Sequence, residues 1–326
     1  MKKIAIEEHF STEEYLSYLR LRKDYTRREI VEDEKYHSIV TMLLDLGEGR
    51  LSDMNESGID MQVLSLSIGV QQFDTSDAIA LAKRTNDELS KIVKKCPERF
   101  AGFAALATQD PNAAADELER AVKGLGLKGA NISSHIKGEY LDDQKYWVIF
   151  ERAEKLDVPI YLHPARPSPD MVKPFLTYPL LADAMWGYAA EAGLHAMRLI
   201  CSGVFDKYPG LKIILGHLGE ALPFWLWRID NRWLKEKVDP EPITKGLKKK
   251  PSQYVKDNFF VTLSGMFWEP ALLCAYLALG ADRILFAVDY PYESNDEAVQ
   301  FIEGVPICDS DKEKICHINA EKILAL

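Results

Sequence analysis

The sequence predicts an α/β protein, a (β/α)8 TIM barrel with a charged segment inserted after its first strand. Eight short apolar runs are each followed by a stretch of helical period, and such alternation is typical of a parallel sheet. Eight repeats favour a closed barrel over an open sheet, and no G-x-G-x-x-G motif follows a strand. No linker-like segment divides the chain, so residues 1–326 are expected to form one domain.

The predicted strands are the eight apolar runs, at residues 3–9, 61–67, 100–105, 128–132, 158–163, 212–217, 259–263 and 283–289. The stretches between them carry helix signals. Residues 75–96 open with capping residues and place apolar side chains near one face. Residues 110–126 begin with Asp-Pro and end in glycines, as a capped helix should. Residues 309–326 are expected to form a helix that seals the barrel.

Two segments are longer than normal loops. Residues 11–55 contain the charged run RLRKDYTRREIVEDEKYH, which is either a solvated helical insertion or a lid over the barrel mouth. Residues 164–178 are rich in proline and directly follow a predicted strand. We therefore expect them to wall a pocket.

Charge and cysteine content narrow the class of protein. The net charge of −10 argues against nucleic acid or an anionic membrane as a partner. The five cysteines are widely spaced without a C-x-x-C pair, so a disulfide framework or a structural zinc site is not expected. No apolar run is long enough for a signal peptide or a membrane span. The sequence thus predicts a cytoplasmic protein.

Polar residues end several of the predicted strands, at the barrel end where chemistry is found. His9, His163 and His217 end strands 1, 5 and 6, and Asp289 ends strand 8. Glu7 lies two residues before His9 and should share its strand face, opposite Ile4 and Ile6. A solvated edge strand is the alternative interpretation of this face alone.

Two imidazoles and two carboxylates would then converge from strands 1, 5 and 8. This mixed nitrogen and oxygen set suits one divalent ion such as Zn or Mn, with positions left open for a substrate. The candidate ligands are Glu7, His9, His163 and Asp289.

His217 is followed three residues later by Glu220, where a new helix is expected to start. This spacing would let the carboxylate orient the imidazole and fix its tautomer. We interpret the two residues as an acid–base or hydrogen-bonding pair rather than as further ligands. A buried histidine beside an ordinary helix-terminal glutamate is the alternative. His195 lies in an apolar helical stretch and is expected only to pack.

Four motifs resemble one known family. The motifs IAIEEHF, LDVPIYLHP, SGVFDKYPGLKIILGHLGEALPFWLWRIDNR and GADRILFAVDYPYE are similar to the metal-dependent decarboxylase branch of the amidohydrolase superfamily. The likeness is greatest to γ-resorcylate (2,6-dihydroxybenzoate) and 2,3-dihydroxybenzoate decarboxylases, and it covers nearly the whole chain. Hydrolases of this superfamily usually open with His-x-His, whereas Glu7 replaces the first histidine here.

The resemblance implies a role for each matching residue. Glu7, His9, His163 and Asp289 match the ligands of one divalent ion, Zn or Mn, with Mg as a further candidate. Asp289 also matches the residue that protonates the ring. The remaining matches are His217 and Glu220 as a hydrogen-bonding pair near the substrate, and Arg228 at the substrate or the subunit interface. The family also implies a homo-oligomer, a dimer or a tetramer.

The chain departs from the family after strand 8. It has Tyr290-Pro291-Tyr292 where relatives often have Trp-Pro-Phe, and Tyr290 is therefore a candidate substrate-binding residue. The residues that differ are expected to lie around the pocket. They leave the ring substitution pattern of the substrate open.

The implied reaction is the metal-dependent, non-oxidative decarboxylation of an ortho-hydroxylated benzoate. An ortho hydroxyl allows chelation and sends electron density to the carbon that bears the carboxylate, where a carboxyl side chain can deliver a proton. Asp289 would need to be protonated at that moment, and metal ligation opposes this. Two alternatives remain: a hydrolase of a small lactone or amide that uses the same ligands, and a non-catalytic barrel that binds a small molecule.

Overall fold

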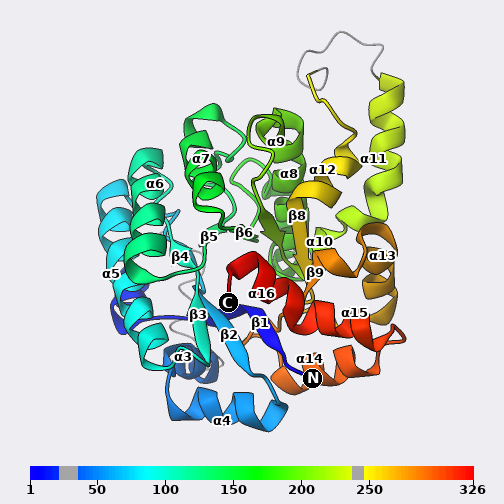
Figure 1. Ribbon diagram of the computed structural model, residues 1–326. Coiled ribbons are helices and arrows are strands. Elements are labelled where there is room, and N and C mark those ends of the chain that lie inside the picture. Colours follow the sequence, from blue (N-terminus) through cyan, green and yellow to red (C-terminus); the bar gives the residue numbers. More distant parts are fainter. Residues whose placement is uncertain (22–35, 237–245) are drawn as a thin grey trace.

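The computed structural model describes residues 1–21, 36–236 and 246–326 as a barrel of parallel strands surrounded by helices (Figure 1). The strands are β1 (Ile4–Phe10), β2 (Met61–Leu66), β3 (Phe100–Gly102), β4 (Ala104–Ala105), β5 (Ala130–Ser133), β6 (Ile160–His163), β7 (Ile213–Leu215), β8 (Phe259–Thr262) and β9 (Ile284–Leu285). They pair in the order β1-β2-β3 and β4 to β9, all in parallel. β3 and β4 share one place in the barrel, so nine segments fill the eight predicted positions.

Hydrogen bonds between loops and strands join the two sheets into a closed barrel. Phe103, between β3 and β4, donates its N–H to the Leu64 carbonyl at 2.9 Å. On the other side, the Ile6 N–H donates to the Phe286 carbonyl at 3.1 Å, which joins β1 to the segment after β9. The predicted (β/α)8 fold is confirmed.

The outer layer consists of helices that follow the strands (Figure 1). They are α1 (Glu13–Leu21), α3 (His37–Leu44), α4 (Glu48–Ser57), α5 (Thr75–Lys95), α6 (Pro111–Arg120), α7 (Trp147–Leu156), α8 (Gly187–Ser202), α9 (Val204–Lys207), α11 (Leu222–Glu236), α12 (Pro251–Asn258), α13 (Glu269–Leu279), α14 (Asn295–Gly304), α15 (Asp309–Glu313) and α16 (Asn319–Leu324). The shorter turns are η2 (Ala121–Leu125), η3 (Gln144–Tyr146), η4 (Lys173–Phe175), η5 (Pro179–Ala182), η6 (Ala281–Arg283) and η7 (Lys314–Ile318).

The predicted capping of α6 is confirmed. Asp110 accepts hydrogen bonds from the N–H groups of Asn112 and Ala113, and Pro111 is the first helical residue.

The barrel interior is a separate apolar core. Its members come from six strands, from the residue between β3 and β4, and from the last helix, namely Ile4, Ile6, Val63, Ala101, Phe103, Tyr161, Ile214, Leu285, Ala320, Ile323 and Leu324. Because the last three belong to α16, this helix closes one end of the barrel, as the sequence predicts. The opposite end, where the strands terminate, is left for the polar side chains.

β1 does not alternate regularly, and this corrects the predicted facing of its residues. The pairing with β2 shifts between Ala5 and Glu8, which marks a β-bulge. Ile4 and Ile6 point into the barrel. Glu7 points there as well, because it accepts a hydrogen bond from the hydroxyl of the interior Tyr161. Bulges are common at barrel rims and next to active sites, where they redirect a side chain.

The inserted segment at 11–55 is only partly a candidate lid. From residue 37 onward it forms α3 and α4, and Arg50 on α4 is 1% exposed, so this part belongs to the packed helical layer. On α1, Tyr18 and Leu21 line a pocket at the barrel mouth. Residues 22–35 of the charged run lie outside the described residues, and for them a lid remains a prediction.

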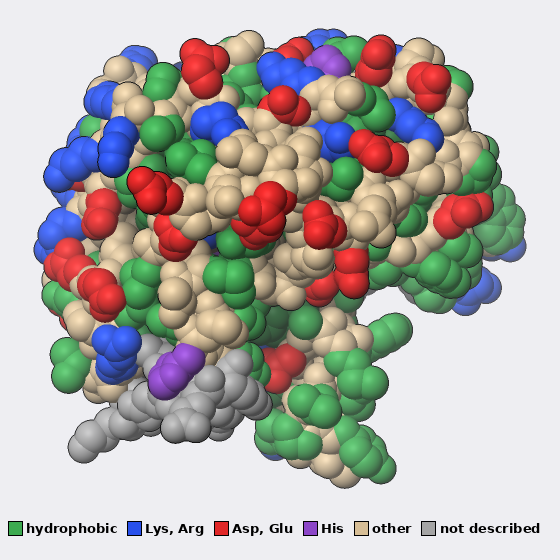
Figure 2. Space-filling view, turned by 90° about the horizontal axis from the view of Figure 1, so that it is seen from below, with side chains coloured by type: hydrophobic (Ala, Val, Ile, Leu, Met, Phe, Trp, Pro, Cys, Tyr) green, Lys and Arg blue, Asp and Glu red, His purple; other side chains and the backbone are tan. Residues whose placement is uncertain are grey.

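The surface carries charges of both signs. Figure 2 shows acidic and basic side chains interspersed over one face of the molecule. Among the described residues, no helix has both the length and the apolar character that crossing a bilayer requires.

Candidate metal centre

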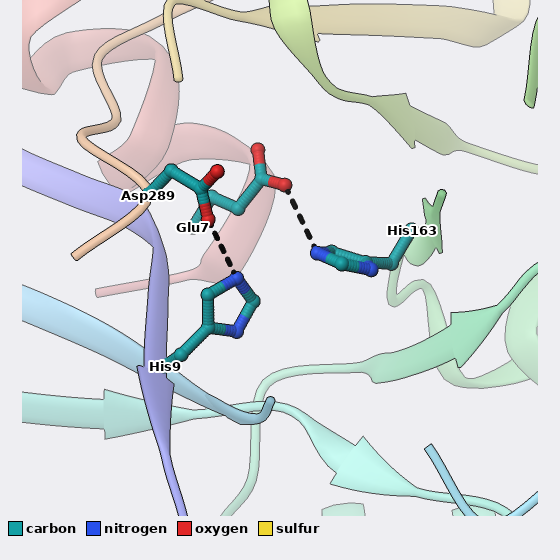
Figure 3. A group of neighbouring side chains, drawn as sticks. All are labelled: Glu7, His9, His163 and Asp289. Atoms are coloured by element: carbon teal, nitrogen blue, oxygen red, sulfur yellow. Dashed lines mark ion pairs between the residues drawn. The ribbon is translucent and has the colours of Figure 1, made fainter. Parts of the chain in front are cut away.

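Four side chains from distant parts of the chain meet at the barrel mouth (Figure 3). Glu7 and His9 come from β1, His163 ends β6, and Asp289 lies four residues after β9. Each offers one ligand atom, and these atoms all lie within 4.8 Å of one another. The first three side chains are buried and Asp289 is 17% exposed. The structure thus brings together the four residues that the sequence predicts as ligands.

Three hydroxyl groups hold the Glu7 carboxylate. Its Oε2 accepts hydrogen bonds from Tyr161, from Thr262 at 3.1 Å and from Ser264. Its Oε1 lies 3.4 Å from His163 Nε2. One oxygen is therefore fixed by the protein, while the other faces the cluster.

The two imidazoles are oriented by the atoms around them. His163 Nδ1 donates to the carbonyl of Pro164 at 2.9 Å, so its Nε2 presents a lone pair to the cluster. His9 Nδ1 lies 3.3 Å from the Ser65 hydroxyl, and its Nε2 is 2.9 Å from Asp289 Oδ1. The two rings meet edge to face at 4.9 Å.

The cluster fits a divalent cation. Glu7 Oε1 and His9 Nε2 are buried and make no hydrogen bond of normal geometry within the described structure. Buried polar atoms are rarely left in this state. Burial also raises the pKa of Glu7, because a carboxylate loses its hydration there. A cation would satisfy both atoms and offset the cost of the buried charge.

His217 and Glu220 form the predicted pair, but on a different backbone from the one predicted. Residues His217–Glu220 (α10), with Ala221, all have positive φ, between 49° and 82°. They therefore form a left-handed turn, and the helix α11 begins only at Leu222. This turn brings His217 Nδ1 to 2.8 Å from Glu220 Oε1.

The imidazole of His217 also faces Asp289, with Nε2 3.6 Å from Oδ2. Burial favours the neutral imidazole, but Glu220, Glu7 and Asp289 together raise the pKa of His217 well above its usual range. Burial would likewise raise the pKa of Asp289, but the nearby imidazoles of His217 and His9 bring it well below its usual range. The proton of this pair therefore resides on His217.

The two other candidate residues lie outside this cluster. The Tyr290 side chain is 6% exposed, belongs to the core between barrel and helices, and packs 4.8 Å below the guanidinium of Arg50. Tyr292, rather than Tyr290, lies beside the cluster, with its ring 5.7 Å from that of His9. Arg228 is exposed on α11 and does not join the cluster within this chain.

A pocket of about 950 Å³ adjoins the cluster. Two of its lining residues contact His163. The Pro164 carbonyl accepts a hydrogen bond from the His163 ring, and Ser133 pairs with His163 in the sheet. Ser67, also in the lining, is hydrogen-bonded to the hydroxyl of Tyr292. The proline-rich segment supplies Pro164, Pro167 and Pro169 to its wall, so the prediction of a pocket wall is confirmed.

His195 belongs to a second buried network beside this pocket. Its Nε2 accepts the Leu141 N–H at 3.0 Å, and its Nδ1 lies 3.3 Å from the Ser134 hydroxyl, which also contacts Glu191 at 3.2 Å. Burial lowers the pKa of His195 to about 3. A neutral histidine with both nitrogens engaged is structural, in agreement with the sequence-based interpretation.

Sequence reasoning missed two residues that support the cluster. The Glu8 carboxylate accepts the N–H groups of Val288 and Tyr290, on either side of Asp289. Arg50 Nη2 donates to the His9 carbonyl at 2.6 Å. The only available signal was the unexplained Glu8 within the Glu-Glu-His motif, and nothing in the sequence connects Arg50 to it.

Comparison with known proteins places the chain among decarboxylases. A γ-resorcylate decarboxylase from Polaromonas sp. (strain JS666) is 41% identical over 99% of this chain and 98% of its own length. The crystal structure of a dihydroxybenzoic acid decarboxylase from Polaromonas sp. JS666, with bound manganese and the inhibitor 2-nitroresorcinol, has a TM-score of 0.91 at 41% identity. It covers 100% of this chain and 97% of that chain.

A second similar structure is that of a decarboxylase named for a different aromatic acid. A 5-carboxyvanillate decarboxylase from Novosphingobium aromaticivorans, complexed with manganese and 4-hydroxy-3-methoxy-5-nitrobenzoic acid, has a TM-score of 0.95 at 38% identity. It covers 100% of this chain and 96% of that chain. The family model described as Amidohydrolase matches residues 43–326. Because this match spans most of the chain and the relatives align over nearly all of it, the chain belongs to the amidohydrolase family.

Proposed function

We propose that this protein is a metal-dependent carboxy-lyase that removes CO₂ from a benzoate with a hydroxyl group ortho to the carboxylate. The observation that carries the proposal is the convergence of Glu7, His9, His163 and Asp289 beside a pocket, in a chain whose full-length relatives are decarboxylases. Intact ligands at the pocket argue against a non-catalytic barrel. The names of the relatives favour decarboxylation over hydrolysis of a lactone or amide.

The four ligands would hold one divalent ion. Two imidazole nitrogens and two carboxylate oxygens suit Mn or Zn, and the two relatives described above contain manganese. When bound, such an ion supplies positive charge for the carboxylate of the substrate and the phenolic oxygen next to it.

The chain itself supplies the proton that replaces CO₂. Of the two carboxyl groups in the cluster, Asp289 is the one that faces His217, at 3.6 Å, and Glu220 binds the other nitrogen of His217. A proton on His217 can pass to Asp289 and from there to the ring carbon, and the C–C bond then breaks as CO₂ leaves and aromaticity returns. Because His217 and His9 lower the pKa of Asp289, its carboxyl group becomes an acid only when His217 passes its proton to it.

The two nitro compounds bound to the relatives support a hydroxyl group ortho to the carboxylate. Both 2-nitroresorcinol and 4-hydroxy-3-methoxy-5-nitrobenzoic acid carry a nitro group next to a ring hydroxyl. They differ in their other substituents. We therefore propose a hydroxyl ortho to the departing carboxylate as the fixed requirement, with the 2,6-dihydroxy ring as the first candidate.

We also propose that the protein is a homo-oligomer. Phe224, Trp225 and Trp227 on α11 are 46–76% exposed, and monomeric proteins rarely leave such an apolar group in water. Arg228 follows them on the same helix. An interface over α11 would bring Arg228 to a partner subunit, which is the setting in which it could meet a substrate.

Removing one ligand should remove the metal. The variant His163→Ala loses a nitrogen donor, and we expect the metal content to fall from about one ion per chain to a small fraction, together with activity. Elemental analysis after dialysis measures this. His317→Ala, a histidine near the C-terminus that pairs with Glu321, serves as the control and should keep its metal. Stoichiometric metal in His163→Ala would show that the ligand assignment is wrong.

The ring requirement can be tested with a panel of acids followed by CO₂ release. We expect 2,6-dihydroxybenzoate to react, and 2,3-dihydroxybenzoate and 5-carboxyvanillate belong in the panel because each has a hydroxyl ortho to a carboxylate. Benzoate and 4-hydroxybenzoate should be inert, since they lack it. Rapid decarboxylation of either of these two would refute the proposed chemistry. Ring-opened or hydrolysed products from a lactone without CO₂ would favour the hydrolase instead.

Asp289→Asn should separate proton delivery from metal binding. An amide can still ligate an ion weakly but has no carboxylic proton to give, so turnover should fall by about 10²–10⁴-fold, more than metal occupancy does. In D₂O, the wild-type product should carry deuterium at the carbon that lost CO₂. Robust turnover by a metal-loaded Asp289→Asn variant would contradict the role of Asp289.

Light scattering tests the oligomer. The mass in solution should be a multiple of the 37.0 kDa chain, and Trp227→Glu should shift it towards one chain because a carboxylate would be buried in the interface. A wild-type mass of one chain would exclude the proposed assembly.

A further inference from the structure

The junction of β1 with the segment after β9 holds three of the four ligands. Glu7 and His9 lie on one side of this junction and Asp289 on the other. Backbone bonds cross it at two points near the ligands, from Asp289 N–H to the Glu7 carbonyl at 3.0 Å and from His9 N–H to the Tyr290 carbonyl at 2.7 Å. The position of Asp289 relative to the other ligands thus depends on this junction.

A side chain also accepts backbone hydrogen bonds at this junction. Glu8 Oε1 accepts the Val288 N–H at 2.9 Å, and Oε2 accepts the Tyr290 N–H at 3.3 Å. These two N–H groups are the neighbours of Asp289 on either side. One carboxylate therefore bridges the backbone on both sides of the metal ligand.

Asp289 needs such support, because its backbone has a φ of 78°. This is the left-handed region, which a residue with a Cβ occupies at a cost of roughly 1–3 kcal/mol unless its surroundings impose it. Two hydrogen bonds to a single fully buried carboxylate restrict this backbone from both sides.

Glu8 is an unusual residue for its surroundings. It is 0% exposed on the side of β1 that faces the outer core, where its neighbours in that core are Ala5 and Phe10. A buried carboxylate costs several kcal/mol in lost hydration, and an apolar side chain would serve packing better. Arg50 lies on the same side, bound to the His9 carbonyl, and its positive charge lowers the cost of burying Glu8.

We propose that Glu8 is a positioning residue, which fixes the Asp289 carboxylate against Glu7 and His9 and thereby sets the affinity for the metal and the rate of proton delivery. This inference rests on the proposed function. Glu8 acts through the backbone of residues 288–290 and does not itself contact the ion or the substrate.

Glu8→Gln tests the proposal with little change in shape. It replaces one acceptor oxygen by an NH₂ group that would face a backbone N–H, so one of the two bonds is lost. Groups that orient metal ligands typically change metal affinity or activity by about 10–100-fold when they are replaced. We expect the Mn²⁺ dissociation constant, measured from the EPR signal of free Mn²⁺, to rise by that factor. At saturating Mn²⁺, kcat should fall more than KM changes.

Glu117→Gln is the matched control. Glu117 is 4% exposed on α6 and accepts a hydrogen bond from Asn86 at 2.7 Å, outside the metal cluster. It should lower the melting temperature while leaving the Mn²⁺ dissociation constant and kcat unchanged. Glu8→Asp is the second variant, since it keeps the charge and both acceptors but is one methylene shorter, and it should show an intermediate loss of affinity.

The outcomes separate this inference from the proposed function. A wild-type protein that binds no Mn²⁺ would refute the function as well as the inference. Wild-type binding with unchanged affinity and kcat in a folded Glu8→Gln would overturn the role of Glu8 alone. Failure of both Glu8 variants to fold, judged by circular dichroism, would assign Glu8 to the stability of the barrel and also overturn the positioning role.

Discussion

Closure of the barrel between β1 and the end of β9 is the constraint on which the rest of the site depends. The first and the last strand of the chain meet there, so residues 7, 9 and 289 become neighbours only once the whole barrel has formed. Closure of the barrel is therefore what brings these candidate ligands together. Long-range pairing of this kind is slow to form, but it yields a rigid frame for the ligands.

The electrostatics of the site follow from this frame. Several ionisable groups share one small buried volume, and each changes the charge state of the others. The hydroxyls of Tyr161, Thr262 and Ser264 compensate one oxygen of Glu7. Glu220 keeps the charge on His217, which in turn keeps Asp289 ionised. A bound cation would offset the remaining negative charge and would ligate Glu7 Oε1 and His9 Nε2, the two buried atoms in the cluster that have no hydrogen-bond partner among the described residues.

Much of this could be predicted from the sequence, because periodicity and strand ends are local signals. The strand–helix alternation predicted the barrel, and the polar residues at strand ends predicted the four side chains that meet at its mouth. Strict alternation in β1 was wrong, since a bulge depends on the pairing with a neighbouring strand and leaves no pattern in one sequence. The position of Tyr290 could not be predicted from the sequence either. The structure buries Tyr290 between barrel and helices, and the ring of Tyr292 lies 5.7 Å from that of His9.

The left-handed turn at residues 217–221 has a consequence for how this enzyme can change. Four of its five residues carry a Cβ, and each occupies a conformation that costs of order 1–3 kcal/mol. A typical domain has only about 5–15 kcal/mol of net stability. The summed conformational cost of this turn is thus comparable to the net free energy of unfolding of a typical domain. The turn is what orients the imidazole of His217. Selection for heat resistance would favour glycine at these positions. Under the proposed role of His217, selection for turnover would oppose it, so durability and catalytic rate would compete at this turn.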